Sequence, residues 1–266
     1  MNWNGLELPE PYYQDESVYI IHGDCREVLP LIPDKSIDLV LTDPPYNENF
    51  NYRDVAFVDY RQDYYEWLEQ LLCRTRGLLK NNGSLYLKHS SRQIPEILEI
   101  LRHHYIFRNL IMWISNSQAH PDRNYDSYYE PIYFLTKGDE YTFNKRAEFR
   151  KQPKDYWSGE GKKFIGLLTN CWYDIPKVQA GCLTPEGLYS GNEKSHPCSM
   201  PVRLAERAIN ISSNVGDVVL DMFIGGGATA LAAKILNRKC IGIEIEEKYC
   251  EIAAKRCSQS VMRLEA

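Results

Sequence analysis

Short apolar runs rich in β-branched residues alternate along this chain with longer segments in which apolar residues recur at helical spacing. The first kind of run predicts buried strands, and the second predicts amphipathic helices that pack on a sheet. We expect strands at residues 18–21, 37–41, 84–88, 109–114, 129–135, 218–220 and 240–245. We expect helices at residues 62–79, 94–104, 202–210, 230–236 and 248–257.

The order of these elements predicts the fold class. Strands that alternate with helices form a doubly wound α/β sheet, here mostly parallel and seven-stranded in a Rossmann-like arrangement. The adjacent runs at 109–114 and 129–135 predict a hairpin at the sheet edge. The helix over 62–79 is expected to end at residues 81–83 (Asn-Asn-Gly), because these residue types favour turns. Residues 1–17, rich in Glu, Pro and Tyr, are expected to form a peripheral arm.

The apolar run at 37–41 ends in Thr-Asp-Pro-Pro-Tyr-Asn, the most informative motif in the chain. Pro44 and Pro45 fix φ and remove two backbone donors, so their carbonyls and the Asp43 side chain point beyond the strand end. Tyr46 adds a flat aromatic face. Acceptors beside a stacking ring suit a planar group with an exocyclic amine, such as an extruded adenine or cytosine. The alternative is a strand-ending turn with an incidental tyrosine, because Pro-Pro turns are common.

A second motif starts at the strand over 218–220, which continues through Asp221 into the turn Gly225-Gly226-Gly227 and a helix of small residues. Glycines at such a turn let a ligand approach the backbone and let the helix pack closely on the sheet. Glu244, about twenty residues further on, is placed to accept hydrogen bonds from ribose hydroxyls. A dinucleotide site fits the same pattern. S-adenosylmethionine is favoured because Asp221 could meet a cationic or amino group, and because Ala230 replaces the third glycine of the dinucleotide fingerprint.

With Asp-Pro-Pro-Tyr first and the glycine turn near the carboxyl end, the chain resembles the β group of DNA amino-methyltransferases, which methylate adenine N6 or cytosine N4 in DNA. Four further segments are similar to that family: residues 23–25 (Gly-Asp-Cys), the strand 83–87, the Trp-containing segment 170–176 and the His-Pro segment 193–201. The resemblance implies that S-adenosylmethionine is the cofactor. It implies the catalytic residues Asp43, Pro44, Pro45 and Tyr46. It implies cofactor contacts from Asp24, Cys25, Asp43, His196, Cys198, Ser199, Asp221, Phe223, Gly225, Gly227, Thr229, Glu244 and Ile245.

The same resemblance implies in-line methyl transfer to an extruded base. Asp43 and the Pro44 carbonyl would accept hydrogen bonds from the target amine, while Tyr46 would stack on the base. Aspartate at the first position of the motif is more typical of adenine enzymes, and serine is more typical of cytosine N4 enzymes. The chain departs from the family at Gly226, where serine is usual, and at Met222 and Met200, where proline and lysine are common. None of these changes removes a group that the chemistry needs.

Composition adds a cellular setting. No stretch is long enough to span a membrane, and the first residues lack the basic-then-apolar pattern of a secretion signal. Eight cysteines are scattered without a paired framework, so we expect reduced thiols in a cytoplasmic protein. No four-ligand zinc pattern occurs in the sequence, and we expect no metal site.

The net charge of −5 is unusual for a protein that binds DNA, but the charge is unevenly distributed. Residues 145–163 carry seven basic side chains against three acidic ones, with interleaved aromatic residues and glycines. Such a segment suits phosphate attachment and base stacking. A solvated loop with ordinary surface lysines is the alternative. The expected DNA-binding residues are Arg146, Arg150, Lys151, Lys154, Lys162 and Lys163.

Together these features predict four regions: an arm at 1–17, a catalytic half at 18–140, a target-recognition region at 141–192 and a cofactor-binding half at 193–266. We expect a site-specific methyltransferase that modifies adenine N6 in double-stranded DNA, in a restriction–modification or host-modification role. It would act as a monomer or homodimer, with a restriction endonuclease as a candidate partner. The alternatives are an N4-cytosine methyltransferase, an NAD-dependent oxidoreductase and a non-catalytic nucleic-acid-binding module.

Overall fold

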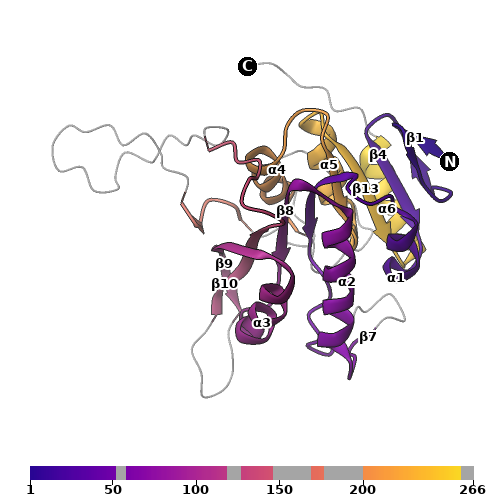
Figure 1. Cartoon of the computed structure of the whole chain (residues 1–266). Helices are drawn as coiled ribbons and strands as arrows, with labels where there is room; N and C mark the ends of the chain where they lie inside the picture. Colours follow the sequence, from indigo (N-terminus) through magenta and orange to yellow (C-terminus); the bar gives the residue numbers. More distant parts are fainter. Residues whose placement is uncertain (52–57, 119–126, 146–168, 177–199, 259–266) are drawn as a thin grey trace.

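The computed structural model describes residues 1–51, 58–118, 127–145, 169–176 and 200–258 (Figure 1). The described residues form a twisted sheet of nine strands. In spatial order these are β11 (Cys171–Trp172), β9 (Ile106–Gln118), β10 (Ser127–Thr136), β8 (Leu79–Lys88), β5 (Ile37–Thr42), β12 (Val218–Asp221), β13 (Lys239–Glu244), β4 (Val18–His22) and β3 (Tyr13–Gln14). Two further pairs of short strands are β1 (Asn2–Trp3) with β2 (Leu6–Glu7) and β6 (Phe50–Asn51) with β7 (Val58–Asp59).

The five central strands β8, β5, β12, β13 and β4 run parallel, whereas β10 is antiparallel to both β8 and β9. From β5 the chain continues to β8 on one side, and from β12 it continues to β13 on the other side. The order of strands therefore reverses between β5 and β12. In open α/β sheets, ligands bind beyond the carboxyl ends of the strands at such a switch point.

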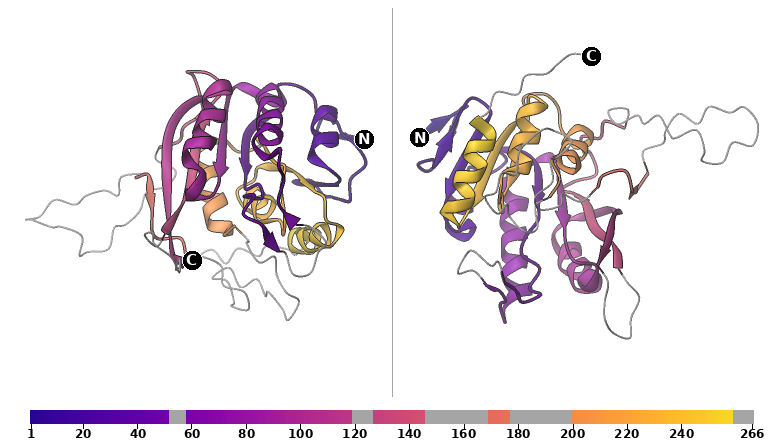
Figure 2. Two further views of the ribbon diagram at one scale, coloured as in Figure 1. Left: turned by 90° about the horizontal axis from the view of Figure 1, so that it is seen from below. Right: turned by 180° about the vertical axis from the view of Figure 1, so that it is seen from behind.

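Helices cover both faces of the sheet (Figures 1 and 2). One face packs against α1 (Cys25–Val28), α2 (Tyr64–Leu78) and α3 (Ile94–His104), together with the 3-10 turns η1 (Leu29–Leu31) and η2 (Ser91–Gln93). The other face packs against α4 (Val202–Ser212), α5 (Ala228–Ile235) and α6 (Glu247–Ser258). None of the helices in the described residues is long and apolar enough to cross a membrane.

Strand β5 shows why apolar residues occupy three consecutive positions, 39–41. Val40 points into the core on the α2 face, while Leu39 and Leu41 point into the core on the α4 and α5 face. Successive strand residues face opposite sides of the sheet, so a strand that is covered on both faces needs apolar residues at every position. The period-2 alternation of a half-exposed strand is therefore absent from β5.

The first residues of the chain pack on the domain. Trp3 is buried in the α2-face core, with its ring centroid 5.2 Å from that of Tyr19. Its indole N–H donates to the Asp15 carbonyl at 2.8 Å, and β3 pairs with β4 at the edge of the sheet. The segment that we expected to be a peripheral arm thus supplies a large aromatic side chain to the core.

The predicted α/β architecture is confirmed. Helix α3 has the predicted bounds, and the hairpin of β9 and β10 is present with longer strands than expected. The seven longer strands of the sheet are the predicted ones. The two-residue strands β11 and β3 extend the sheet at its edges, and strands of that length leave no periodic signal in a sequence.

The predicted turn at residues 81–83 is wrong. Helix α2 ends at Leu78, one residue before the predicted bound of 79, and residues 81–83 lie inside β8. A Cβ atom on Gly83 would lie 2.8 Å from the Leu79 side chain and 3.1 Å from the Asp38 carbonyl oxygen. The glycine therefore serves the close approach of β8 and β5, not a turn after the helix.

Candidate active site

The catalytic turn, residues 43–47, follows the carboxyl end of β5 at the switch point of the sheet. Thr42, the last residue of β5, is fully buried and donates its hydroxyl hydrogen to Asp221 Oδ1 at 3.1 Å. This contact joins the end of β5 to the end of β12, where the glycine turn begins. The structure therefore brings two motifs that lie 179 residues apart in the sequence to one edge of the sheet.

Side chains from neighbouring elements hold the turn through its backbone. The Tyr64 hydroxyl from α2 donates to the Pro45 carbonyl at 2.6 Å and contacts His89 Nε2 at 2.6 Å. The Gln93 amide donates to the Tyr46 carbonyl at 2.6 Å. The Tyr46 ring also packs against His89, with centroids 4.9 Å apart. These contacts fix the shape of the turn.

Two residues that the sequence analysis missed, Lys88 and Glu130, complete the surroundings of Asp43. Lys88 Nζ lies 3.0 Å from Asp43 Oδ2 and 2.5 Å from Glu130 Oε2, and it also contacts the Tyr46 hydroxyl. That hydroxyl donates to Asp43 Oδ1 at 2.7 Å and lies 3.4 Å from Glu130 Oε2. Lys88 is the last residue of β8, and its register partner on β10 is Ile132. Glu130 lies two residues before Ile132 on the same strand. One ammonium therefore serves two carboxylates.

Burial makes these charges interact strongly. The side chains of Lys88, Asp43 and Glu130 are only 6%, 15% and 18% exposed. Burial opposes the charge on Lys88, but the nearby carboxylates outweigh it and raise the pKa of the ammonium above its ordinary value. Burial also raises the pKa of Asp43. Burial and the charge of Lys88 lower the pKa of His89 to about 3, so this imidazole is neutral at neutral pH.

A cavity of about 220 Å³ lies beside Asp43, over the carboxyl ends of β4, β5, β12 and β13. Predicted cofactor residues that line it are Asp24, Cys25, Asp43, Asp221, Phe223, Gly225, Thr229, Glu244 and Ile245. Residues that line it but were missed from the sequence include Tyr60, Arg61, Tyr64, Trp67, Tyr249 and Arg256. The missed residues come mainly from α2, α6 and the segment before α2, which carry no ligand-binding motif.

The glycine turn is held by two acidic residues. Glu244 Oε2 accepts the Gly225 N–H at 2.9 Å, and burial raises the pKa of this carboxyl group. Asp221 is buried and accepts hydrogen bonds from the Thr229 hydroxyl at 2.6 Å and the Phe223 N–H at 3.1 Å. Burial raises the pKa of Asp221 to about 7. Both side chains therefore shape the turn as well as lining the cavity.

Gly227 has a structural role at the start of α5. Its φ of +81° lies in the left-handed region, and a Cβ atom there would lie 2.8 Å from the Cβ of Ala253 on α6. Only glycine combines this backbone conformation with so close an approach. Gly227 thus holds α5 against α6 below the cavity.

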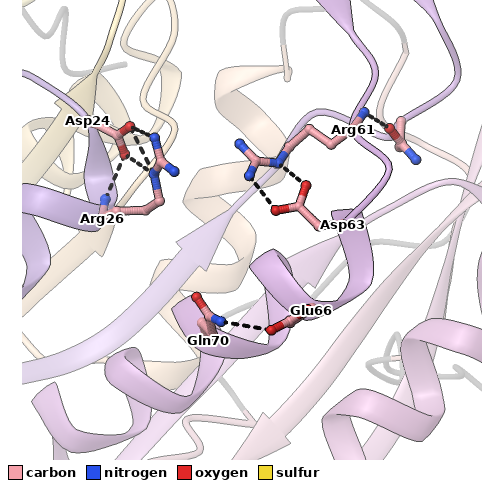
Figure 3. A network of polar contacts seen from close by, with 7 residues as sticks. Asp24, Arg26, Arg61, Asp63, Glu66 and Gln70 are labelled. Atoms are coloured by element: carbon pink, nitrogen blue, oxygen red, sulfur yellow. Dashed lines mark hydrogen bonds and ion pairs between the residues drawn. The ribbon is translucent and has the colours of Figure 1, made fainter.

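The rim of the cavity carries two arginine–aspartate pairs (Figure 3). Asp24 caps the start of α1, and its carboxylate is bound by the Arg26 guanidinium at 2.5 Å. The pairing with Arg26 lowers the pKa of Asp24. Arg61 pairs with Asp63 at 2.8 Å and lies 5.2 Å from the centre of the Trp67 ring. An incoming ligand would therefore meet Asp24 with its charge already balanced.

Several predicted residues lie outside the described part of the chain. These are His196, Cys198, Ser199, Arg146, Arg150, Lys151, Lys154, Lys162 and Lys163. Their roles at the cofactor and on DNA stay predictions. No cluster of potential metal ligands occurs among the residues that the structure describes.

Comparison with known proteins identifies the family. The family model for DNA methylases matches residues 37–255. DNA adenine methyltransferase YhdJ of Escherichia coli (strain K12) is 32% identical over 262 residues, which cover 92% of this chain and 84% of that protein. The chain belongs to the DNA methylase family.

Two further relatives extend this result. Type II methyltransferase M.HpaI of Haemophilus parainfluenzae is 31% identical over 244 residues, with 89% of this chain and 73% of that protein covered. The crystal structure of the M1.HpyAVI–SAM complex is 26% identical, with a TM-score of 0.60, and the match covers 91% of this chain and 100% of that one. The DNA methylase fold therefore spans most of the chain.

S-adenosylmethionine is the methyl donor of this family, and the cavity of this methylase fits it. Trp67 and Phe223, with ring centroids 5.7 Å apart, give the cavity an apolar aromatic wall. Glu244 offers carboxylate oxygens at the end of β13, where ribose hydroxyls are bound in related folds. Asp43, the first residue of the catalytic turn, lines the same cavity.

Proposed function

We propose that this methylase transfers a methyl group from S-adenosylmethionine to the N6 amine of adenine in double-stranded DNA. The observation that carries the proposal is the position of Asp43, which lines the cofactor cavity at the start of a turn held by Tyr64 and Gln93. Two arguments favour adenine. Aspartate at the first motif position is typical of adenine enzymes, and the relative YhdJ is named a DNA adenine methyltransferase.

Asp43 and the Pro44 carbonyl would hold the amine of the extruded base through two hydrogen bonds. When bound, S-adenosylmethionine supplies an electrophilic methyl group on a sulfonium sulfur. The amine lone pair must point at that methyl group, so the main task of the turn is orientation. Extruding the base from the duplex costs a few kcal/mol. Stacking of Tyr46 on the base would contribute roughly 1–3 kcal/mol and so offset part of that cost.

The charge around Asp43 suits this reaction. The amine nitrogen gains positive charge as it takes the methyl group, and it then loses a proton. The carboxylates of Asp43 and Glu130 both lie within 3.0 Å of the Lys88 ammonium. A fixed carboxylate in a poorly hydrated site stabilises the developing cation. Lys88 at the same time favours the ionised form of Asp43, which can accept but not donate hydrogen bonds.

Cytosine N4 is the second candidate target. Its exocyclic amine would make the same two contacts with Asp43 and Pro44, so the turn alone does not separate the two bases. Selection of adenine over cytosine requires a further protein contact along the Watson–Crick edge of the base.

The partners follow from the target. We propose that the region 141–192, with its basic residues Arg146, Arg150, Lys151, Lys154, Lys162 and Lys163, attaches to DNA phosphates. A restriction–modification or host-modification role, with a cognate endonuclease as a candidate partner, is supported by the type II relatives. We further propose a monomer or homodimer in the cytoplasm, in keeping with the free cysteine thiols of the described residues.

Base-resolution sequencing of DNA from a methylation-deficient host that expresses the chain tests this function. We expect N6-methyladenine at one recurring sequence, and no mark in a host that expresses the Asp43→Ala variant. Marks on cytosine N4 would instead establish the second candidate. Unmarked DNA from cells with folded, cofactor-binding protein would contradict both.

A further inference from the structure

Three buried charges form a row at the carboxyl edge of the sheet: Asp43 after β5, Lys88 at the end of β8 and Glu130 on β10. Adjacent members are 3.0 Å and 2.5 Å apart, and they alternate as acceptor, donor and acceptor. We propose that this row reads the Watson–Crick edge of the target adenine. Asp43 accepts from the N6 amine, Lys88 donates to N1, and Glu130 faces the C2–H. The inference rests on the proposed function, because it takes adenine as the target.

The third position of the row separates the two candidate bases. Adenine presents an amine, a ring nitrogen acceptor and a C–H group along this edge, whereas cytosine presents an amine, a ring nitrogen acceptor and a carbonyl oxygen. Asp43 and Lys88 suit both bases. Glu130 tolerates a C–H group, but it would set a carboxylate against the cytosine O2 and leave two acceptors without a shared hydrogen. An unpaired buried acceptor is costly, so the row favours adenine.

The Tyr46 hydroxyl already makes the contacts that a base edge would make. It donates to Asp43 at 2.7 Å and contacts the Lys88 ammonium. The Asp43 acceptor and the Lys88 donor are therefore both hydrogen-bonded to the same hydroxyl. Adenine N6–H and N1 form the same donor–acceptor pair. When Tyr46 turns to stack on the base, the base can take over both contacts, and neither buried charge loses its hydrogen bonds.

A second lysine on β8 forms an ion pair away from the catalytic turn and can be compared with the row. At the opposite end of the strand, Lys80 Nζ lies 2.8 Å from both carboxylate oxygens of Asp38. That pair has one cation and one anion, and the Lys80 side chain is 42% exposed. The row instead buries Lys88 between two carboxylates, beside the residue that binds the target amine. The row therefore differs from the Lys80–Asp38 pair in its second carboxylate and in the burial of its lysine.

Single-atom changes in the target base test the proposal on the wild-type protein. The duplexes carry the mapped recognition sequence with adenine, 1-deazaadenine or 7-deazaadenine at the target position. Loss of N1 should lower kcat/KM roughly 10- to 100-fold, the cost of a hydrogen bond from a charged donor. Loss of N7, on the other side of the base, is the matched control and should change kcat/KM less than about threefold. Equal rates on the two analogues would overturn the proposal.

Variants then assign each contact to a side chain. In Lys88→Met, the penalty for 1-deazaadenine should disappear, whereas Lys80→Met should keep the full penalty. If the variant turns over too slowly, the same comparison is made by measuring duplex affinity in the presence of S-adenosylhomocysteine. Binding of S-adenosylhomocysteine by the variant confirms that the variant is folded. A full 1-deazaadenine penalty in Lys88→Met would exclude Lys88 as the N1 donor.

Glu130 has its own test. Glu130→Gln replaces an acceptor by an amide that can donate to cytosine O2, so the preference for adenine over cytosine at the target position should fall at least about tenfold. Glu96→Gln on the exposed start of α3 is the control. An unchanged preference would overturn the role of Glu130. Cytosine as the natural target in the mapping experiment contradicts the proposed function, whereas an adenine target with no analogue effect contradicts only the reading of its edge.

Discussion

Replacing Lys88 with methionine tests the charge cluster that surrounds Asp43. The substitution removes an ammonium that lies 3.0 Å from Asp43 and 2.5 Å from Glu130. Removing one partner of a buried ion pair costs about 3–5 kcal/mol, because the remaining charge keeps its desolvation penalty. The two carboxylate side chains are 15% and 18% exposed, so water relieves part of that penalty. We therefore expect the free energy of unfolding to fall by about 3 kcal/mol at neutral pH.

The pH dependence of this loss has a definite sign. Without Lys88, burial and repulsion from Glu130 both hold the folded-state pKa of Asp43 above its unfolded value. A carboxyl group with a raised folded pKa stabilises the fold below its unfolded pKa and loses that contribution as pH rises through the folded value. The deficit of Lys88→Met should therefore be small near about pH 4 and approach about 3 kcal/mol by about pH 8.

Urea unfolding followed by circular dichroism measures both effects across this pH range. Lys255→Met is the control, because it breaks a lysine–glutamate pair on α6 whose two side chains are 60% and 56% exposed. Such a surface pair contributes about 0–1 kcal/mol, so the control should lose little and show a weaker pH dependence. A deficit in Lys88→Met below about 1 kcal/mol at every pH, or one that shrinks as the pH rises, would refute the reasoning.

Three further predictions concern function. Asp43→Ala should abolish methyl transfer while calorimetry still detects S-adenosylmethionine binding, and near-normal turnover would show that the catalytic assignment is wrong. Glu244→Ala should weaken S-adenosylmethionine binding by about 1–3 kcal/mol, because charged hydrogen bonds are lost. Glu247→Ala, at an exposed position, is the control, and equal cofactor affinities of the two variants would show that Glu244 is not part of the site. A triple alanine variant at the basic segment replaces Arg150, Lys151 and Lys154. It should reduce the slope of log DNA affinity against log salt by about 0.9 for each of about three lost phosphate contacts, and an unchanged slope would place DNA elsewhere.

The catalytic turn could be predicted from the sequence because its signals are local. Two prolines after an apolar strand fix the turn, and the residues that do the chemistry are part of the same short motif. Asp221 and Glu244 were found for a similar reason, since each ends a strand at the edge where ligands bind. Their contacts with the glycine turn were not foreseen, because they depend on how the turn folds back over the strand ends.

Lys88 and Glu130 show what local signals leave out. A lysine at the end of an apolar strand is a weak signal, since strands often end in a charged residue. Glu130 reaches Lys88 only because β10 pairs antiparallel with β8 in one register, in which Ile132 is the partner of Lys88. That register is set by tertiary packing of both strands and not by residues near Glu130. The incorrectly predicted turn at residues 81–83 has the same origin, because Gly83 is required by the close approach of β5, which is distant in the sequence.

Product analysis with purified protein tests the central claim most directly. The chain is incubated with unmethylated DNA and S-adenosylmethionine that carries a deuterated methyl group, and the DNA is digested to nucleosides for mass spectrometry. We predict labelled N6-methyladenine with the wild-type protein and none with Asp43→Ala. Labelled N4-methylcytosine in place of N6-methyladenine, or an equal yield of N6-methyladenine from the variant, would contradict the account.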